Sequence, residues 1–227
     1  MTEAELKEIA RQLRHPQGES GIKMGENMHK SNFAMTQAAV ALLELQPGQT
    51  VIEIGHGSAR HLPWLLAQGD DLRYIGLEVS ATMHAEAKRL NQSALQSGAV
   101  DLKLYDGRTF KLPFPVPQAD IFTVNTIYFW DQPEAMMAEI DRILPVGGAL
   151  VLAFAEKEFM ARLPFTPYGF RSYDEAAVVE IAASTQLHLD QVETHRDQVF
   201  SKAGDPVDRT YQVLRLVKQA PASGKIA

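Results

Sequence analysis

The sequence of 227 residues contains no cysteine, which excludes a disulfide framework and any chemistry that depends on a thiolate. It also lacks an uninterrupted apolar run of the roughly 18 residues that a membrane-spanning helix requires. Its start, Met1–Glu8, carries acidic side chains and lacks the apolar segment of a secretory signal. These absences predict a cytoplasmic protein without a transmembrane segment.

Positive charge is also scarce. The sequence has 22 Lys and Arg residues against 28 Asp and Glu residues, a net charge of -6, and it contains no run of five basic residues. Because a nucleic-acid partner requires clustered basic residues, we expect none. We expect no metal site either, because His56 and His61 are five positions apart across a predicted turn and lack the i, i+4 spacing of paired ligands on a helix.

From position 51 onward, short apolar strands alternate with amphipathic helices. The alternation is typical of parallel βαβ units in which helices cover both faces of one sheet, and it therefore predicts an α/β fold. The strands are expected at Val51–Ile54, Tyr74–Glu78, Val100–Tyr105, Asp120–Val124 and Ala149–Phe154. The helices between them are expected at Arg60–Ala67, Ser80–Ser97 and Pro133–Leu144.

The two ends of the chain depart from this alternation. At the N-terminus, helical spacing over Glu3–Leu13 is followed by a predicted loop, Gln17–Gly25, and by a second helix that reaches about Leu45. After Phe154, the pattern predicts a helix and then two antiparallel strands around a turn. These elements are Asp174–Ser184, Leu187–His195 and Thr210–Val217, with Gly204–Asp205–Pro206 between the strands.

The best candidate for a ligand site is the turn Glu53–Ala59, which follows the first strand. Gly55 and Gly57 have no Cβ, so a ligand can approach the backbone, and free N–H groups at the next helix start face the same point. Glu53 opposes phosphate and favours an ammonium or a sulfonium. The spacing Gly55-x-Gly57-x-Ala59 also differs from G-x-G-x-x-G, which argues against a nicotinamide-dependent oxidoreductase.

Further polar groups follow the later strands, at the edge where open α/β sheets bind ligands. Glu78 can accept both hydroxyls of a ribose, because an ionised carboxylate has only acceptors. Asp106–Gly107 is either a turn or an acceptor for an exocyclic amine such as that of adenine. Met83 either packs on an adenine face or belongs to the core. Asn125 and Tyr128 have the best claim to face a ligand in the aromatic segment after the fourth strand.

Together these motifs resemble the class I S-adenosylmethionine-dependent methyltransferase family. The resemblance rests on Val51–Gly57, Gly76–Glu78, Asp106–Gly107 and Leu144–Gly148. It covers roughly Asn32 to Phe154. The stretch Asp120–Glu134 is similar to the small-molecule branch that includes ubiquinone and menaquinone C-methyltransferases.

The resemblance implies a Rossmann-like three-layer sandwich. Its sheet would have seven strands, mostly parallel, and would end in an antiparallel hairpin. Residues 1–218 would form one methyltransferase domain, with an N-terminal helical lid at 1–46 and an α/β core at 47–218, and residues 219–227 would be a flexible tail.

The resemblance also implies that S-adenosyl-L-methionine is the cofactor, and it assigns residues by position. Ala59 stands where a third glycine is frequent in the family, which puts cofactor affinity in doubt rather than the fold. The cofactor-binding residues that the resemblance implies are Glu53, Gly55, His56, Gly57, Glu78, Val79, Met83, Asp106, Gly107 and Asn125.

We expect a small-molecule acceptor, aromatic or lipid-like, that is methylated by in-line displacement. Its predicted contacts form either an apolar pocket or only a capping subcore; they are Met28, Tyr128, Trp130, Phe165 and Tyr168. A covalent nucleophile is not needed, and the candidates for a base are His29, His84 and Tyr128. A homodimer is also considered. The alternative to catalysis is a module that binds S-adenosylmethionine and acts as a regulator or partner.

Overall fold

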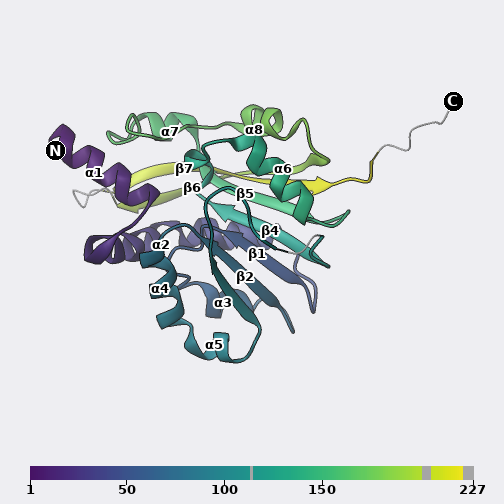
Figure 1. The fold of residues 1–227 in the computed structure, drawn as a ribbon. Coiled ribbons are helices and arrows are strands. Elements are labelled where there is room, and N and C mark those ends of the chain that lie inside the picture. The colour runs from purple at the N-terminus through teal and green to yellow at the C-terminus, as the bar shows by residue number, and fades with distance from the viewer. Residues whose placement is uncertain (113–114, 201–205, 222–227) are drawn as a thin grey trace.

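A seven-stranded sheet in the order β3-β2-β1-β4-β5-β7-β6 forms the centre of the fold (Figure 1). The computed structural model describes residues 1–112, 115–200 and 206–221, without the side chain of residue 200. The parallel strands are β1 (Thr50–Ile54), β2 (Arg73–Glu78), β3 (Val100–Leu104), β4 (Ala119–Val124) and β5 (Ala149–Ala155). The antiparallel strands are β6 (Leu187–Phe200) and β7 (Pro206–Lys218). The predicted mostly parallel sheet with a terminal hairpin is confirmed.

Helices cover both faces of this sheet (Figure 1). One face carries α2 (Gly18–Ala41), α3 (Leu62–Leu66), α4 (Ala81–Leu90) and α5 (Gln92–Gln96). The other carries α6 (Pro133–Ile143), α7 (Lys157–Ala161) and α8 (Glu175–Ala182). Two further helices, α1 (Glu3–Arg14) and the short 3₁₀ helix η1 (Ile127–Phe129), lie near the ends of strands.

The sheet is apolar on both faces, because alternate residues of a strand point to opposite sides. Val51 packs in the cluster beneath α2 and α3, whereas Ile52 and Ile54 pack in the cluster beneath α6 and α8. This double burial explains the continuous apolar runs of the central strands. Among the described residues, no helix combines the length and apolar character needed to cross a membrane.

Side chains at the helix starts fix several of the boundaries. Thr2 and Glu5 form a reciprocal capping box at the start of α1. Ser80 caps α4 by accepting a hydrogen bond from the Met83 N–H at 3.1 Å. Asp174 does the same at α8, accepting from the Ala177 N–H at 2.9 Å.

The predicted loop Gln17–Gly25 is wrong, because α2 already begins at Gly18. The glycines of this stretch allow close packing rather than a turn. A Cβ on Gly21 would lie 2.7 Å from the backbone carbon of Pro16, and one on Gly25 would lie 2.5 Å from the sulfur of Met83. The helix α2 can therefore pack this closely against Pro16 and against Met83 of α4 only because it has glycine at these two positions.

The predicted helix Ser80–Ser97 is divided in two at Asn91. The buried Asn91 side chain donates hydrogen bonds to the carbonyls of Ala87 and Ala59, at 2.9 and 3.1 Å. A side chain that takes a backbone acceptor in this way competes with helix continuation. The hairpin strands also extend further than predicted, whereas Gly204 and Asp205 lie outside the described residues.

Candidate cofactor and acceptor site

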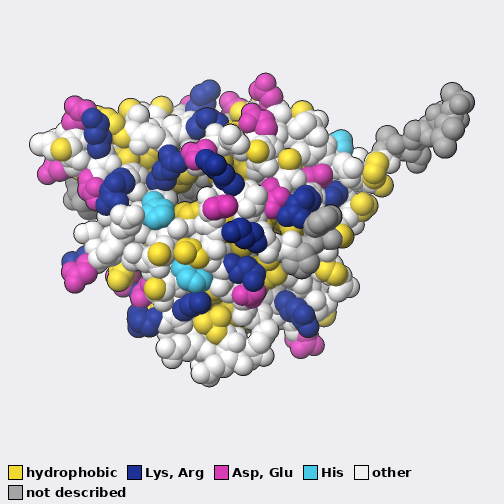
Figure 2. Space-filling view, viewed as in Figure 1, with side chains coloured by type: hydrophobic (Ala, Val, Ile, Leu, Met, Phe, Trp, Pro, Cys, Tyr) yellow, Lys and Arg dark blue, Asp and Glu magenta, His cyan; other side chains and the backbone are white. Residues whose placement is uncertain are grey.

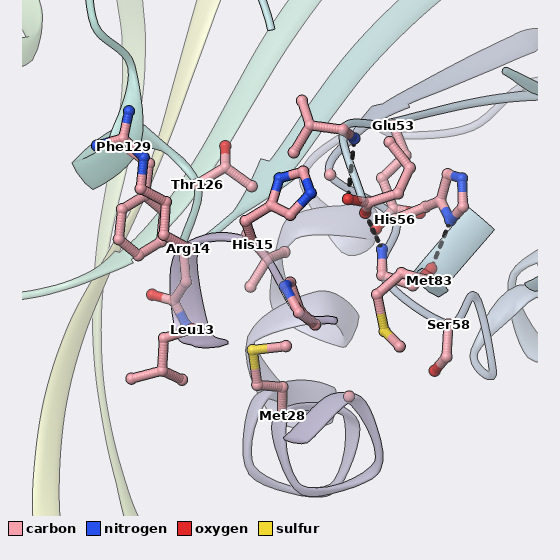
Figure 3. A pocket seen from close by; sticks show the side chains of 18 of the residues that line it. Leu13, Arg14, His15, Met28, Glu53, His56, Ser58, Met83, Thr126 and Phe129 are labelled. Atoms are coloured by element: carbon pink, nitrogen blue, oxygen red, sulfur yellow. Dashed lines mark hydrogen bonds between the residues drawn. The ribbon is translucent and has the colours of Figure 1, made fainter. Parts of the chain in front are cut away.

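A cavity of about 450 Å³ lies at the carboxyl ends of β1 to β4, beneath the junction of α1 and α2. Figure 3 shows Leu13, Arg14 and His15 at one wall, Met28 on α2, and Glu53 and His56 toward the sheet. The structure brings every predicted cofactor-binding residue together here. The residues in question are Glu53, Gly55, His56, Gly57, Glu78, Val79, Met83, Asp106, Gly107 and Asn125.

Glu78 binds the glycine loop through backbone donors. Its Oε2 accepts from the Gly57 N–H at 2.8 Å, and its Oε1 accepts from the N–H groups of Val79 and Ser80 at 2.9 and 2.8 Å. Burial raises the pKa of this carboxyl, and the three backbone donors oppose that rise. Because a carboxylate offers about four lone-pair positions, one remains for a ligand.

The turn after β1 depends on glycine at a particular point. Gly55 has a φ of 79°, and a Cβ there would lie 2.4 Å from the Cγ2 atom of Thr126. Gly57 has a φ of 55°, with no heavy atom within 4 Å of the corresponding Cβ position. Ala59 adopts a φ of 47° despite its side chain. The close approach to Thr126, in the turn after β4, therefore requires glycine only at the first of these positions.

Glu53 lines the cavity, but its carboxylate is already bound on the side of α3. It accepts from the Tyr74 hydroxyl, and its Oε2 lies 2.7 Å from His61 Nε2. Burial opposes ionisation, yet the charge and hydrogen bonds of His61 and Tyr74 leave the Glu53 pKa lowered. The acid is thus held ionised by protein partners. Among the described residues, no group of three His, Cys, Asp or Glu residues could hold a metal ion.

His56 is buried between the cavity and α4. Its Nδ1 lies 2.8 Å from the Gly57 carbonyl, whereas its Nε2 has no hydrogen-bond partner among the described residues. Burial is the main cause that lowers the pKa of His56 to about 4, against the opposing charge of Glu53. The ring is therefore neutral near pH 7. His84 lies 6.3 Å away by ring centroids and is not among the cavity-lining residues.

Asp106 and Met83 form the far end of the cavity. The Asp106 carboxylate caps its own turn, accepting from the N–H groups of Arg108 and Thr109 at 2.9 and 2.8 Å, and these bonds lower its pKa. Met83 is fully buried, with Gly25 of α2 against its sulfur. Each residue therefore has a structural role and also lines the cavity, and its contact with adenine stays a prediction.

Asn125 and Tyr128 hold each other after β4. The Tyr128 hydroxyl donates to Asn125 Oδ1 at 2.8 Å and accepts from the Ala155 N–H at 2.6 Å. Burial raises the Tyr128 pKa, so the phenol keeps its proton. Asn125 lines the main cavity and Tyr128 does not. Tyr128 is therefore poorly suited to act as a base.

The helices α1 and α2 with their junction, residues 3–41, make up most of the predicted lid at residues 1–46. Polar contacts fasten it around the cavity: the Ser80 hydroxyl donates to the Pro16 carbonyl at 2.5 Å, and Arg60 pairs with Glu26 at 2.9 Å. Within the lid, His29 lines the cavity, and its ring centroid lies 6.5 Å from that of His61. Burial, followed by the charges of His61 and Arg60, lowers the His29 pKa.

Comparison with known proteins relates this chain to methyltransferases. Residues 52–152 match the family described as a methyltransferase domain. This match, which spans less than half of the chain, indicates an S-adenosylmethionine-dependent methyltransferase domain. The tRNA (guanine-N(7)-)-methyltransferase of Wolinella succinogenes is 29% identical over 124 residues, which are 51% of this chain and 31% of that protein. The chain thus matches only about a third of the length of this curated relative.

Solved structures share the fold of the methyltransferase domain. One is from the complex between the Haloferax volcanii Trm112 methyltransferase activator and a methyltransferase, with a TM-score of 0.73 and 16% identity over 88% of this chain and 94% of that one. Another is the geranyl diphosphate C-methyltransferase of Streptomyces coelicolor in complex with S-adenosyl-L-homocysteine, with a TM-score of 0.65 and 11% identity over 89% of this chain and 85% of that one. At these identities the likeness shows the fold alone.

The acceptor side of the methyltransferase domain differs from the prediction. Met28 and Trp130 line the main cavity, but Phe165 and Tyr168 line neither it nor a second cavity beside it. Tyr168 instead lies under Lys7 of α1, 5.6 Å from the ammonium. The turns after α7 bring Tyr168 to α1 and the Phe165 ring to 5.5 Å from that of Phe170 by centroids, which the composition of the segment could not indicate.

Several further residues that line the cavity were not expected from the sequence. Most belong to the lid or follow η1, and no motif marks them; they include Leu13, Arg14, His15, Asn32, Thr36, Phe129 and Asp131. One signal was present, because Pro16 ends α1 and thereby turns the chain back over the strand tips. The His15 ring reaches into the cavity from this turn (Figure 3).

Proposed function

We propose that this protein transfers the methyl group of S-adenosylmethionine to a small-molecule acceptor, aromatic or lipid-like. One observation carries the proposal: a single cavity joins the carboxylate-lined tips of β1, β2 and β3 to the aromatic residues Phe129 and Trp130 beneath the lid. A cationic nucleoside suits the first end and an apolar acceptor suits the second.

The residues at the strand tips fit the cofactor by their chemistry. The free lone pair of Glu78 suits one ribose hydroxyl rather than the two first expected, because three positions already accept backbone N–H groups. Asp106 suits the amine of adenine, and Met83 supplies an apolar wall. The glycine loop allows the methionine portion to approach the backbone.

When bound, S-adenosylmethionine supplies an electrophilic methyl group on a sulfonium. The acceptor atom forms a bond to that carbon as the carbon–sulfur bond breaks, and the acceptor loses a proton if it is a hydroxyl or amine. The chain holds the acceptor in line and excludes water with its lid; such positioning contributes up to roughly 7–11 kcal/mol in favourable cases.

His29 is the residue we propose for the proton. It lines the cavity from α2, and its lowered pKa keeps the imidazole neutral and able to accept a proton near pH 7. His29→Gln should slow methyl transfer at least tenfold and leave S-adenosylhomocysteine affinity within twofold. An unchanged rate would remove His29 from the mechanism. His84→Gln is the matched control, because His84 does not line the cavity.

The finer assignments also belong to this proposal. The likeness of Asp120–Glu134 to quinone methyltransferases supports the small-molecule branch, and we propose that residues 1–218 act as one domain with residues 1–46 as its lid. RNA is not the proposed acceptor, although the curated relative is a tRNA methyltransferase. The net charge is -6, and charges of both signs are interspersed on the face that Figure 2 shows.

Calorimetry with S-adenosylmethionine, S-adenosylhomocysteine and NAD tests the cofactor directly. We expect saturable binding of the first two and none of NAD. A screen with a labelled methyl donor then covers quinones, phenols, amines, carboxylic acids and tRNA. Absence of binding by both S-adenosyl compounds would overturn the proposal. Binding without transfer to any acceptor would favour the non-catalytic regulatory module.

A further inference from the structure

A second cavity of about 260 Å³ adjoins the first on the side of β5, away from the cofactor end. The two cavities share Arg14, Phe129, Trp130 and Asp131 as lining residues. Sheet order explains the arrangement. The tips of β3, β2 and β1 lie at the cofactor end, β4 leads to η1 in the middle, and the turns that follow α7 contribute the far wall.

The far wall is built of aromatic rings and fixed backbone. The rings of Phe129 and Phe170 lie 4.7 Å apart by centroids, and Tyr128 lies 5.9 Å from Phe170. The Arg171 N–H donates to the Tyr128 carbonyl at 3.1 Å, which holds the loop against η1. An apolar chain or ring therefore has a continuous wall from the first cavity into the second.

The sign of charge changes between the two cavities. Carboxylates of Glu53, Glu78 and Asp106 line the first, at the strand tips. Among the described residues, the second is lined by two arginines, Arg14 and Arg171, against the single carboxylate of Asp131. Asp131 already forms an ion pair with Arg14 at 2.6 Å, so the negative charge of Asp131 is largely neutralised. The remaining excess charge of the second cavity is positive.

An unpaired donor lies where the cavities meet. Trp130 lines both of them and is a buried residue with 6% of its surface exposed. Its indole Nε1 has no hydrogen-bond partner among the described residues. Buried indole N–H groups ordinarily have a partner, because leaving one unpaired is costly. An acceptor atom on a ligand in this space would satisfy it.

We propose that the second cavity binds an anionic group, a carboxylate or a phosphate, on the methyl acceptor, with Arg171 and the Trp130 indole N–H as its donors. The inference rests on the proposed function, since it names the class of molecule that the same site methylates. Guanidinium groups suit both anions because their planar donors match two oxygens at once. The acceptor is then an amphipathic acid: its anion lies in the second cavity, its apolar body lies along Phe129, and its reacting atom reaches the strand tips.

Four matched probes test the inference on the full chain saturated with S-adenosylhomocysteine: octanoate, octyl phosphate, 1-octanol and octylammonium. Calorimetry should give an affinity for octanoate or octyl phosphate at least tenfold above that for 1-octanol, and the better of the two identifies the anion. Octylammonium should bind most weakly. Equal affinity for the neutral and anionic probes, or binding by none of the four, would overturn the inference.

Three variants assign the effect to this cavity. Arg171→Gln should weaken binding of the preferred anion at least fivefold, and Trp130→Phe, which removes the N–H and keeps most of the ring, at least threefold. Arg73→Gln is the control, because Arg73 is exposed at the opposite end of β2. An effect of Arg73→Gln as large as that of Arg171→Gln would refute the assignment, and unchanged affinity in Trp130→Phe would remove the indole from it.

Separate measurements distinguish this inference from the proposed function. S-Adenosylhomocysteine should bind Arg171→Gln and wild type equally, and thermal unfolding should confirm that each variant is folded. If S-adenosylhomocysteine binds and the anion has no advantage, the inference fails and the proposed function stands. If S-adenosylhomocysteine does not bind the wild type, both fail.

Discussion

The two ends of the site are built in different ways. At the cofactor end, backbone N–H groups bind carboxylates: the buried Glu78 holds the loop after β1, and the exposed Asp106 holds its own turn. At the acceptor end, side chains from distant parts of the chain meet, as Arg14 of α1 does with Asp131 after η1. The cofactor end is thus formed by the turns of the sheet itself, whereas the acceptor end is formed by segments that pack against the sheet.

This difference separates stability from specificity. A change at the strand tips should disturb folding and cofactor binding together, because the same hydrogen bonds serve both. A change at the acceptor end should alter ligand preference with little loss of stability, because exposed pairs contribute little. The predictions below test this separation, beginning with the largest expected effect.

Glu78→Ala should have the largest effect. It leaves the N–H groups of Gly57, Val79 and Ser80 without their acceptor in a buried site. Each unpaired buried donor costs about 1–3 kcal/mol, so we expect the free energy of unfolding to fall by about 3–4 kcal/mol. Urea denaturation measures the loss.

Cofactor affinity provides the second measurement on Glu78→Ala. Calorimetry should show weaker S-adenosylhomocysteine binding by about 1–3 kcal/mol, the cost of one lost polar contact. If the variant loses stability but keeps its cofactor affinity, Glu78 stabilises the glycine loop and does not bind the cofactor. Trp130→Phe is the comparison at the acceptor end and should leave this affinity unchanged.

The sequence predicts the cofactor end better than the acceptor end, because the two ends are built in these different ways. The cofactor end follows from short spacings after each strand, because parallel strands bring Gly55, Glu78 and Asp106 to one edge whatever the rest of the chain does. The acceptor end depends on where α1 and the turns after α7 pack. Phe165 and Tyr168 looked equivalent to Trp130 by composition, yet only Trp130 lines the cavities.

Gly55→Ala tests how tightly the first turn is constrained. The substitution forces a side chain into a φ of 79° and places its Cβ 2.4 Å from Thr126 Cγ2. We expect a loss of about 2–3 kcal/mol in unfolding free energy, since backbone strain of this kind alone costs about 1–3 kcal/mol. Gly57→Ala is the control: its Cβ would meet nothing within 4 Å, so it should lose only about 1 kcal/mol. Equal losses of unfolding free energy in the two variants would show that Thr126 moves aside to accommodate the new Cβ.

The pH dependence of stability should reveal His56. Burial lowers its folded pKa to about 4, from 6.5, so between these values the unfolded chain binds a proton that the folded chain does not. Its contribution is therefore fully present above pH 6.5 and is lost as the pH falls toward 4. Between pH 7 and pH 4.5 this loss amounts to about 2 kcal/mol.

His56→Asn isolates that contribution. Urea denaturation at the two pH values should show a fall in stability about 2 kcal/mol smaller for the variant than for wild type. His29 and His84 also have lowered pKa values and remain in both proteins, so they cancel in the difference. The same fall in both proteins would mean that His56 titrates normally.

Asp131→Asn should have the smallest effect on stability. Asp131 forms an ion pair with Arg14, and the two side chains are 60% and 46% exposed, respectively. Such exposed pairs contribute about 0–1 kcal/mol to stability. Ser80→Ala is the control on the same lid, because the buried Ser80 hydroxyl binds Pro16 and caps α4, and its loss should cost about 1–2 kcal/mol. Thermal and urea unfolding compare the two variants.

The same Asp131→Asn variant should nevertheless change ligand preference. It removes a carboxylate that lines the second cavity and releases Arg14. Octanoate or octyl phosphate should therefore bind the S-adenosylhomocysteine complex more tightly, by about 1 kcal/mol or less in a partly exposed site. Tighter anion binding at unchanged stability would demonstrate that the acceptor end is adjustable without the fold. A loss of stability as large as that of Ser80→Ala would show instead that the Arg14–Asp131 pair holds the lid, and the distinction between the two ends would fail there.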